Sequence, residues 1–225
     1  APAVRVAIGD HFGYAKGENV MGKLVGVLHR LGFDEVYDTS YGADLTVVEE
    51  SKEFIERFTS GQKMPLFTSC CPAWVKYCET KYPEFVPNLS TCRSPQQMFG
   101  AILKSYWAEK NSVNPTTIYC VSVMPCIAKK SELKREEMNV NGIQDVDASI
   151  TTRELARMIR MYGLESITNE ERTDMEGIIS MYGETEYIPL LFLGRGRNRC
   201  KQGQLDWDMA IGMAARGLKW IGLGW

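Results

Sequence analysis

Cysteines are the side chains of this sequence whose type and spacing indicate chemistry. Cys70 and Cys71 stand side by side before Pro72, and Cys126 lies further along the chain. Proline favours the first position of a helix, so Cys71 is expected at a helix start. Such a start stabilises a thiolate through unpaired N–H groups and the positive end of the helix dipole. Because metals bind the thiolate, these cysteines are candidate metal ligands.

A purely structural role for the same cysteines stays open on this reasoning. The sequence has no Cys-x-x-Cys pair, and unpaired cysteine is often a buried core residue. For Cys78, Cys92 and Cys120, which fall within regular elements, we favour a core or surface role. The seven cysteines are an odd number and the chain is long enough for a core, so a disulfide framework is not expected.

Composition excludes several classes of protein. The 225 residues carry a formal net charge of −2 and no block of basic and aromatic residues, so nucleic-acid binding is not expected. The longest apolar runs are strand-sized, so no membrane span is expected. Clustered reduced cysteines favour a reducing compartment, which means the cytoplasm or an organellar matrix. The sequence begins without Met, and we interpret its first residue as a processed or excised boundary.

Strand–loop–helix repeats organise the chain up to about residue 162. The pattern predicts strands over 4–8, 35–37, 65–68, 117–123 and 146–150, and helices over 20–31, 44–58, 72–82, 95–110 and 152–162. Capping boxes are expected at 94–97 and 151–154. The alternation predicts an α/β fold with mostly parallel twisted sheets flanked by helices. Functional loops then follow the carboxyl ends of strands, where Cys71 and Cys126 would meet if their strands are neighbours.

Two segments, Thr68–Trp74 and Met124–Lys130 with Glu132, resemble the first two signature segments of iron-only (FeFe) hydrogenases. Further similar stretches are Ala1-Pro2, Ala43–Thr46, Asn88–Ser90, Ser94–Gln97, Asp145–Asp147 and Thr151–Leu155. The resemblance covers about residues 1–192. It implies one catalytic domain whose active site lies between lobes of roughly 1–125 and 126–192, followed by a divergent tail over 193–225.

The resemblance also implies the cofactor, an H-cluster made of a 4Fe-4S cubane joined through a cysteine to a diiron subcluster. By position, Cys71 and Cys126 correspond to two cubane ligands. Cys70 corresponds to the proton donor beside the diiron unit, and Lys129 to a cation that holds a cyanide ligand by a charge-assisted hydrogen bond. The residues that would line the diiron pocket are Pro2, Pro95, Gln96, Met124 and Lys129.

A proton path carries over from the family in the same way. It would lead from Cys70 through Glu50, Ser90 and Glu53 to Arg57 near the surface. The two glutamates are three residues apart on an expected helix, so their carboxylates share one face. Without the resemblance, they would be interpreted as solvated surface acids.

The third signature segment of the family, which supplies two further cluster cysteines, has no counterpart in this sequence. After Phe192 the chain reads Leu193–Cys200, and Cys200 is the one cysteine left as a further ligand. We weigh three explanations. The chain is a truncated or frame-shifted product, or a variant with rearranged ligands that include one from a second chain, or a protein that kept the fold and lost the chemistry.

Two functions follow from the resemblance. The first is reversible reduction of protons to dihydrogen, with electrons from ferredoxin or a similar carrier and with maturation proteins that assemble the cofactor. The second is a non-catalytic iron–sulfur protein similar to the hydrogenase-like assembly proteins of eukaryotes, or an incomplete hydrogenase fragment. Cys70, Lys129 and the Glu50–Glu53 pair favour the first, because a simple carrier needs neither a proton donor nor a proton path.

Overall fold

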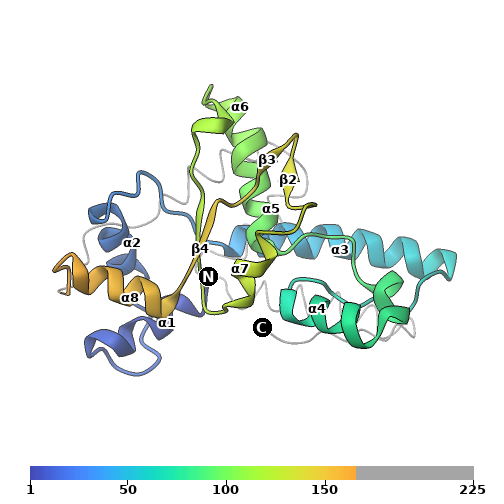
Figure 1. Cartoon of the computed structure of the whole chain (residues 1–225), viewed down its shortest axis with the longest axis horizontal. Coiled ribbons are helices and arrows are strands. Elements are labelled where there is room, and N and C mark those ends of the chain that lie inside the picture. The colour runs from blue at the N-terminus through green and yellow to red at the C-terminus, as the bar shows by residue number, and fades with distance from the viewer. Residues whose placement is uncertain (166–225) are drawn as a thin grey trace, which may run out of the picture. The chain divides into compact units, whose positions relative to one another are not determined.

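The structure, a computed structural model, describes residues 1–165 (Figure 1). Its helices and strands follow one another along the chain as α1 (Val4–Ala7), α2 (Met21–Arg30), α3 (Ser40–Ser60), α4 (Pro72–Lys81), α5 (Pro95–Ile102), α6 (Ala108–Lys110), β1 (Val121–Met124), α7 (Ala128–Glu132), β2 (Asn139–Val140), β3 (Ile143–Gln144), β4 (Ala148–Thr151) and α8 (Thr152–Met161). Short 3-10 turns cover Gly9–Phe12, Pro83–Asn88 and Pro115–Thr117, and a π-helical turn, Leu103–Trp107, joins α5 to α6.

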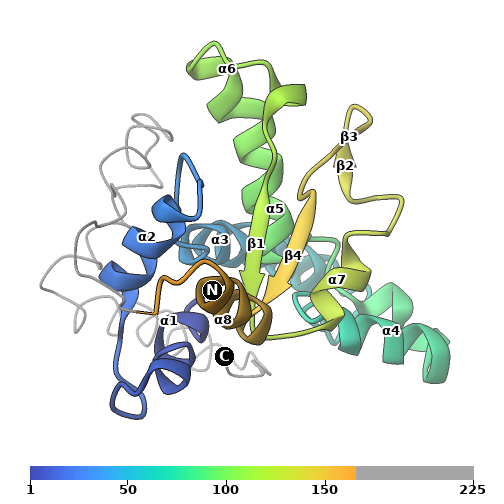
Figure 2. The ribbon, with the colours of Figure 1, turned by 60° about the vertical axis from the view of Figure 1, so that its left-hand side comes forward.

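The sheet content of residues 1–165 is small. Strands β1 and β4 pair in parallel from Val121 opposite Ala148 to Met124 opposite Thr151, and β2 and β3 form an antiparallel hairpin. Figure 2 shows β1 and β4 side by side, with α5 behind them and α8 in front. The described part is therefore mixed α/β and mostly helical, with one small parallel pair where mostly parallel sheets are expected from the sequence.

The first predicted strand, residues 4–8, is wrong, since it forms helix α1. Val4 and Ile8 are both fully buried, and their spacing of four residues places them on one helix face. They pack in one hydrophobic cluster with residues of α2 and α8, including Leu28 and Leu155. The β-branched composition suggested a strand, but the apolar spacing is that of a helix.

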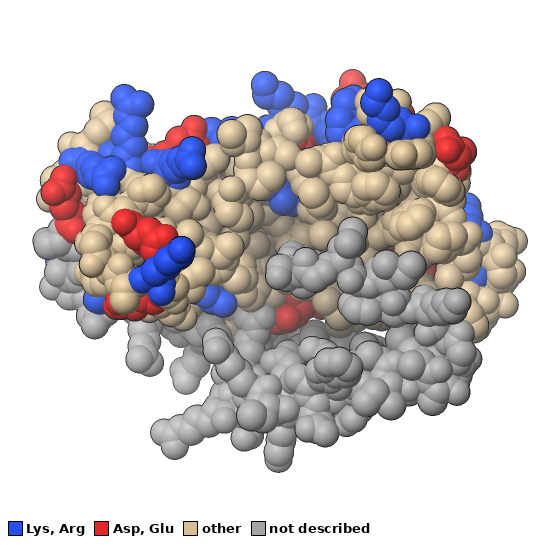
Figure 3. Space-filling view, turned by 90° about the horizontal axis from the view of Figure 1, so that it is seen from below, with Lys and Arg blue, Asp and Glu red and all other residues tan. Residues whose placement is uncertain are grey.

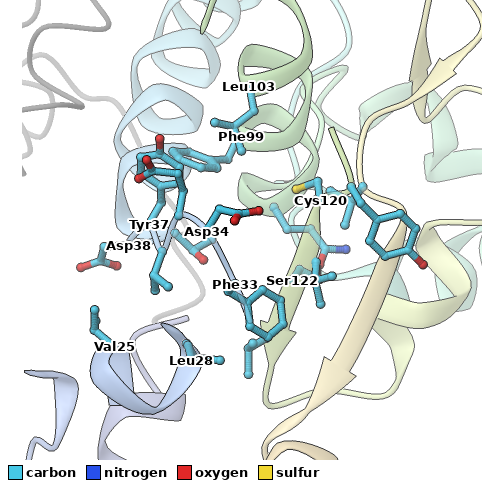
Figure 4. Close-up of a pocket in the computed structure, with 18 of the residues that line it drawn as sticks. Val25, Leu28, Phe33, Asp34, Tyr37, Asp38, Phe99, Leu103, Cys120 and Ser122 are labelled. Atoms are coloured by element: carbon cyan, nitrogen blue, oxygen red, sulfur yellow. Dashed lines mark hydrogen bonds between the residues drawn. The ribbon is translucent and has the colours of Figure 1, made fainter. Parts of the chain in front are cut away.

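The predicted strand at Glu35–Tyr37 is absent from the described residues. This segment instead lines a largely apolar cavity of about 550 Å³, whose other walls come from α2, α5 and β1 (Figure 4). A strand needs a neighbouring strand for its backbone groups, and here the cavity separates the segment from β1. Gln96 and Met124 also line the cavity, but none of the cysteines at 70, 71 and 126 does.

Helices α3 and α5 position most of the candidate site and cross at very short range. A Cβ atom on Gly42 would lie 2.1 Å from the carbonyl oxygen of Pro95, so only glycine permits this approach. Helix α3 ends at Ser60, and its C-cap residue, Gly61, has a left-handed φ of 66°, which glycine adopts without strain. The crossing brings the start of α3 beside the start of α5.

Most predicted helices are confirmed, including those over 20–31, 44–58, 72–82 and 152–162. The capping box of α8 is also confirmed: Thr151 accepts from the Glu154 N–H, and the Glu154 carboxylate accepts from the Thr151 N–H. The capping box expected at Ser94–Gln97 does not form. Ser94 is the N-cap residue of α5, but its hydroxyl makes no cap hydrogen bond and donates to Glu132 instead.

The surface of the described part carries mixed charge. In Figure 3, Lys and Arg side chains gather along the edges of one face with Asp and Glu among them, and the middle of that face is largely uncharged. Within residues 1–165, no helix combines the length and the apolar composition needed to cross a membrane.

Candidate active site

The first cysteine segment lies at the start of α4, as predicted. Cys71 is the N-cap residue and is exposed, whereas Cys70 is partly buried. The predicted strand over 65–68 is reduced to one parallel bridge between Phe67 and Leu89. The Phe67 carbonyl accepts from the Ser90 N–H at 2.7 Å. This bridge holds the Cys70 loop beside the segment that carries Ser90.

The second cysteine segment meets the first, but not through neighbouring strands. Cys126 is partly buried and follows β1, whose partner strand among the described residues is β4. Helix α7 packs against α4. The ammonium group of Lys129 on α7 donates to the carbonyl oxygen of Cys70 at 2.7 Å. The two segments are thus joined by a helix–helix contact and one charged hydrogen bond.

The thiols available to a metal cluster are limited in this part of the chain. Residues 1–165 contain no group of three or more His, Cys, Asp or Glu side chains placed to hold a metal ion. Of the six free cysteines in the described residues, Cys71 and Cys126 are the two predicted cubane ligands, and Cys200 lies outside the described residues. A cubane takes about four cysteine ligands, so these two fit half of that set.

The residues predicted to line a diiron pocket differ in their placement. Pro95, Gln96 and Met124 are buried, whereas Pro2 is exposed. Gln96 is held at both ends of its amide: it accepts from the Ser122 hydroxyl at 2.8 Å and donates to the Glu132 carboxylate. This side chain therefore has a fixed orientation at the start of α5.

A hydrogen-bonded relay is centred on Glu53. Its carboxylate accepts from the Ser90 hydroxyl at 3.0 Å, from the Thr91 N–H at 3.0 Å and from the Arg57 guanidinium at 2.5 Å. Burial tends to raise the pKa of Glu53, but these hydrogen bonds and the Arg57 charge outweigh it and hold the pKa below its usual range. Two of the predicted path residues, Ser90 and Arg57, thus contact a third, Glu53.

Arg57 is itself buried, and its guanidinium also donates to backbone carbonyl groups. It donates to the carbonyl oxygens of Leu89 at 2.8 Å and Pro87 at 3.3 Å. Its side chain is only 9% exposed, and that of Glu53 is 14% exposed. Glu53 is therefore not the solvated surface acid that the sequence suggests without the family resemblance.

Glu50 and Cys70 are the two predicted path residues between the Ser90–Glu53–Arg57 contacts and the cysteine loop. Burial raises the pKa of Glu50, the nearby Ser90 hydroxyl and Ser69 amide act against it, and the charge of Glu53 adds to it. Its Oε1 atom is buried without a hydrogen-bond partner in the described part. Burial also raises the pKa of the Cys70 thiol, the Glu50 charge adds to this, and Lys129 opposes it.

The raised pKa of Glu50 should make the free energy of unfolding depend on pH. The folded protein holds this proton to higher pH than the unfolded chain does, so the free energy of unfolding falls as pH rises from the ordinary carboxyl range to the raised pKa. Glu50→Gln removes the titration, so its stability relative to the wild type should increase over that window and then level off. Urea unfolding at a series of pH values measures this, and parallel curves for the two proteins contradict it.

Two further residues of the site were not predicted. The Cys92 thiol lies 4.0 Å from Glu53 Oε2, and burial raises its pKa to about 11. Glu132 on α7 is buried and accepts hydrogen bonds from Ser94, Gln96 and Lys129. For Glu132 the available signal was its place in the second family-like segment, three residues after Lys129 on one helix face.

Comparison with known proteins assigns the family. Residues 1–188 match the model of the "Iron only hydrogenase large subunit, C-terminal domain". The chain is 52% identical over 167 residues to the "Periplasmic [Fe] hydrogenase large subunit" of Nitratidesulfovibrio vulgaris, which covers 73% of the chain and 40% of that protein. It is 36% identical over 166 residues to the "Cytosolic Fe-S cluster assembly factor narfl" of Danio rerio, with 71% and 40% covered.

A solved structure agrees. The apo [FeFe]-hydrogenase HydA1 from Chlamydomonas reinhardtii, in a variant form, superposes with a TM-score of 0.73 at 42% identity, covering 78% of this chain and 45% of that one. The chain spans less than half the length of each of these proteins. The names of these two relatives place them in different compartments, the periplasm and the cytosol. Because residues 1–188 of this chain match the family model, the chain belongs to the iron-only hydrogenase family and corresponds to the C-terminal domain of the large subunit.

Proposed function

We propose that this chain forms the proton-delivering side of an H-cluster site in an enzyme that reversibly reduces protons to dihydrogen. The observation that carries the proposal is the 2.7 Å hydrogen bond from Lys129 to the Cys70 carbonyl, which joins the two signature segments at one point. The buried contacts of Ser90 and Arg57 with Glu53, next to that point in the fold, support it.

The cofactor requires residues of two kinds. Cys71 and Cys126 would hold the cubane, with Cys200 as a third candidate ligand outside the described residues. Gln96 and Met124 would bound the diiron unit, and Lys129 supplies a positive charge for one of its anionic ligands. When bound, the cofactor supplies the redox chemistry and the site at which hydrogen forms.

The chain's own residues move the proton. Arg57 fixes the Glu53 carboxylate at the outer end, where it accepts from the Ser90 hydroxyl. Because a hydroxyl both donates and accepts, Ser90 passes a proton onward to Glu50. Burial raises the pKa of Glu50, so its carboxyl holds a proton to higher pH than an exposed glutamate does and is suited to take up and release one. Cys70 then donates the proton to the reacting centre.

The electron supply and the assembly of the cofactor come from other proteins in this proposal. A ferredoxin or a similar carrier delivers electrons, and maturation proteins insert the diiron unit. A second chain that contributes ligands is part of the proposal, because only two of the free cysteines in the described residues, Cys71 and Cys126, are candidate cubane ligands. We place the reaction in a reducing compartment, the cytoplasm or an organellar matrix, since the cysteines must stay reduced.

Hydrogen evolution by matured protein tests this function. The chain is purified without oxygen, reconstituted with iron and sulfide, loaded with a diiron precursor and assayed with a chemically reduced electron carrier. We expect hydrogen evolution that depends on the diiron precursor. Loading of iron without precursor-dependent hydrogen contradicts the proposed activity and favours the second candidate.

That second candidate is a non-catalytic iron–sulfur protein. Similarity to the cytosolic Fe-S cluster assembly factor of Danio rerio supports it, as does the presence of only two candidate cubane thiols in the described part. The buried Ser90–Glu53–Arg57 relay favours the hydrogenase, because a protein that only binds a cluster has no use for a proton path.

A further inference from the structure

Glu132 is a buried carboxylate with no assigned role in the proton path or in cluster binding. Its side chain is 4% exposed at the end of α7. A buried carboxylate is costly unless it is paired and hydrogen-bonded. Its partners therefore indicate why it is retained.

The partners of Glu132 come from two different elements. Ser94 at the start of α5 donates to Oε2 at 2.8 Å, and Gln96 donates to the same oxygen at 2.5 Å. Lys129, one turn earlier on α7, lies 3.3 Å from Oε2 and 3.5 Å from Oε1. Glu132 thus fixes Lys129 relative to the start of α5. This helix carries Gln96, one of the residues predicted to line the diiron pocket.

The contacts of Lys129 fix the directions of its N–H donors. An ammonium has three N–H donors. In Lys129 one donates to the Cys70 carbonyl at 2.7 Å and a second is directed to the Glu132 carboxylate. Among the contacts found in residues 1–165, the third donor is left for another acceptor. With two directions fixed by protein groups, the third is fixed as well.

We propose that Glu132 is the positioning residue that orients Lys129, so that its remaining N–H donates to an anionic ligand of the cofactor beside Cys70. This rests on the proposed function, since it assumes that such a ligand is present. Glu132 acts through Lys129 and does not itself touch the cofactor. Its carboxylate balances the Lys129 charge when the cofactor is absent and holds the amine in place for binding.

The test reads out Lys129 in the metal-free chain. Acylating reagents need an accessible amine, and the Lys129 side chain is only 12% exposed while the Glu132 carboxylate anchors its ammonium group. Glu132→Gln removes this anchor and should therefore raise the rate of Lys129 acetylation severalfold, as followed by peptide mass spectrometry. Because no metal is involved, this result is independent of whether the chain forms a cluster or evolves hydrogen.

The matched control is Glu154→Gln, which removes the carboxylate partner of the adjacent Lys130 and, as glutamine, keeps the capping box of α8. It should raise acetylation of Lys130 and leave Lys129 unchanged. An unchanged rate at Lys129 in folded Glu132→Gln overturns the proposal. If circular dichroism shows that Glu132→Gln is unfolded, Glu132→Asp decides. That variant moves the charge by one methylene, and no increase at Lys129 then overturns the proposal.

In loaded protein, the infrared bands of the cofactor's cyanide ligands give a second readout besides activity. A side chain that merely stabilised the fold would leave these bands in place once the variant is folded and loaded. We expect Glu132→Gln to shift a cyanide band, and Glu132→Asp to shift it less. Bands identical to those of the wild type in both variants contradict the positioning role.

Discussion

Cys70→Ser is expected to lower hydrogen evolution by the matured protein by about 10²-fold or more while the optical absorption of its cluster persists. The thiol lies partly buried beside the point where Lys129 joins the two cysteine segments. Serine is close to cysteine in size and still carries a proton donor, but its hydroxyl is a much weaker acid than a thiol. The proton step should therefore fail while the cubane ligands stay intact.

The control for this variant is Cys78→Ser. Cys78 is buried on α4 and is not part of the candidate site, so any effect on activity should follow its effect on folding. Hydrogen evolution and absorption are measured on the same samples. If Cys70→Ser loses the absorption together with the activity, Cys70 is a cluster ligand and its assignment as a proton donor is wrong.

Glu53→Ala is expected to destabilise the chain by about 3 kcal/mol and to lower hydrogen evolution by roughly 10²-fold. The substitution leaves the Arg57 guanidinium buried without its carboxylate, although Arg57 keeps its carbonyl partners at Leu89 and Pro87. It also removes the acceptor of the Ser90 hydroxyl. Urea unfolding gives the first quantity and the hydrogen assay gives the second.

The matched control is Glu49→Ala, on the same helix. Glu49 forms an exposed ion pair with Lys52, whose side chains are 42% and 50% exposed, so its loss should change stability by less than about 0.5 kcal/mol. The effect of Glu53→Ala should also depend on pH. Because the pKa of Glu53 is held low, its contribution is present above the ordinary carboxyl pKa and is lost as pH falls through the lowered value. Equal effects of the two substitutions contradict the buried relay.

Local sequence signals predicted most helices and failed where a tertiary contact replaced a local one. The capping box at Thr151 formed because its groups lie three residues apart and need no distant partner. Ser94 offered the same pattern, but the buried carboxylate of Glu132 takes its hydroxyl hydrogen bond. No property of residues 94–97 indicates that partner, which lies 38 residues further along the chain.

The contacts around Glu53 could be predicted from the sequence, whereas the contact between Lys129 and Cys70 could not. The spacing of Glu50 and Glu53 placed both carboxylates on one helix face, and the resemblance to the family supplied Ser90 and Arg57, which the structure places against Glu53. The contact of Lys129 with the Cys70 carbonyl had no such signal, because a backbone oxygen accepts from any donor that the fold brings near.

The central claim is that Cys71 and Cys126 hold one iron–sulfur cluster, and iron content per chain tests it most directly. After anaerobic reconstitution with iron and sulfide, the wild-type chain should carry about four iron atoms. Cys71→Ala and Cys126→Ala should each lower this number, whereas Cys120→Ala should not. Iron near zero in the wild type, or iron unchanged by both ligand substitutions, contradicts the claim.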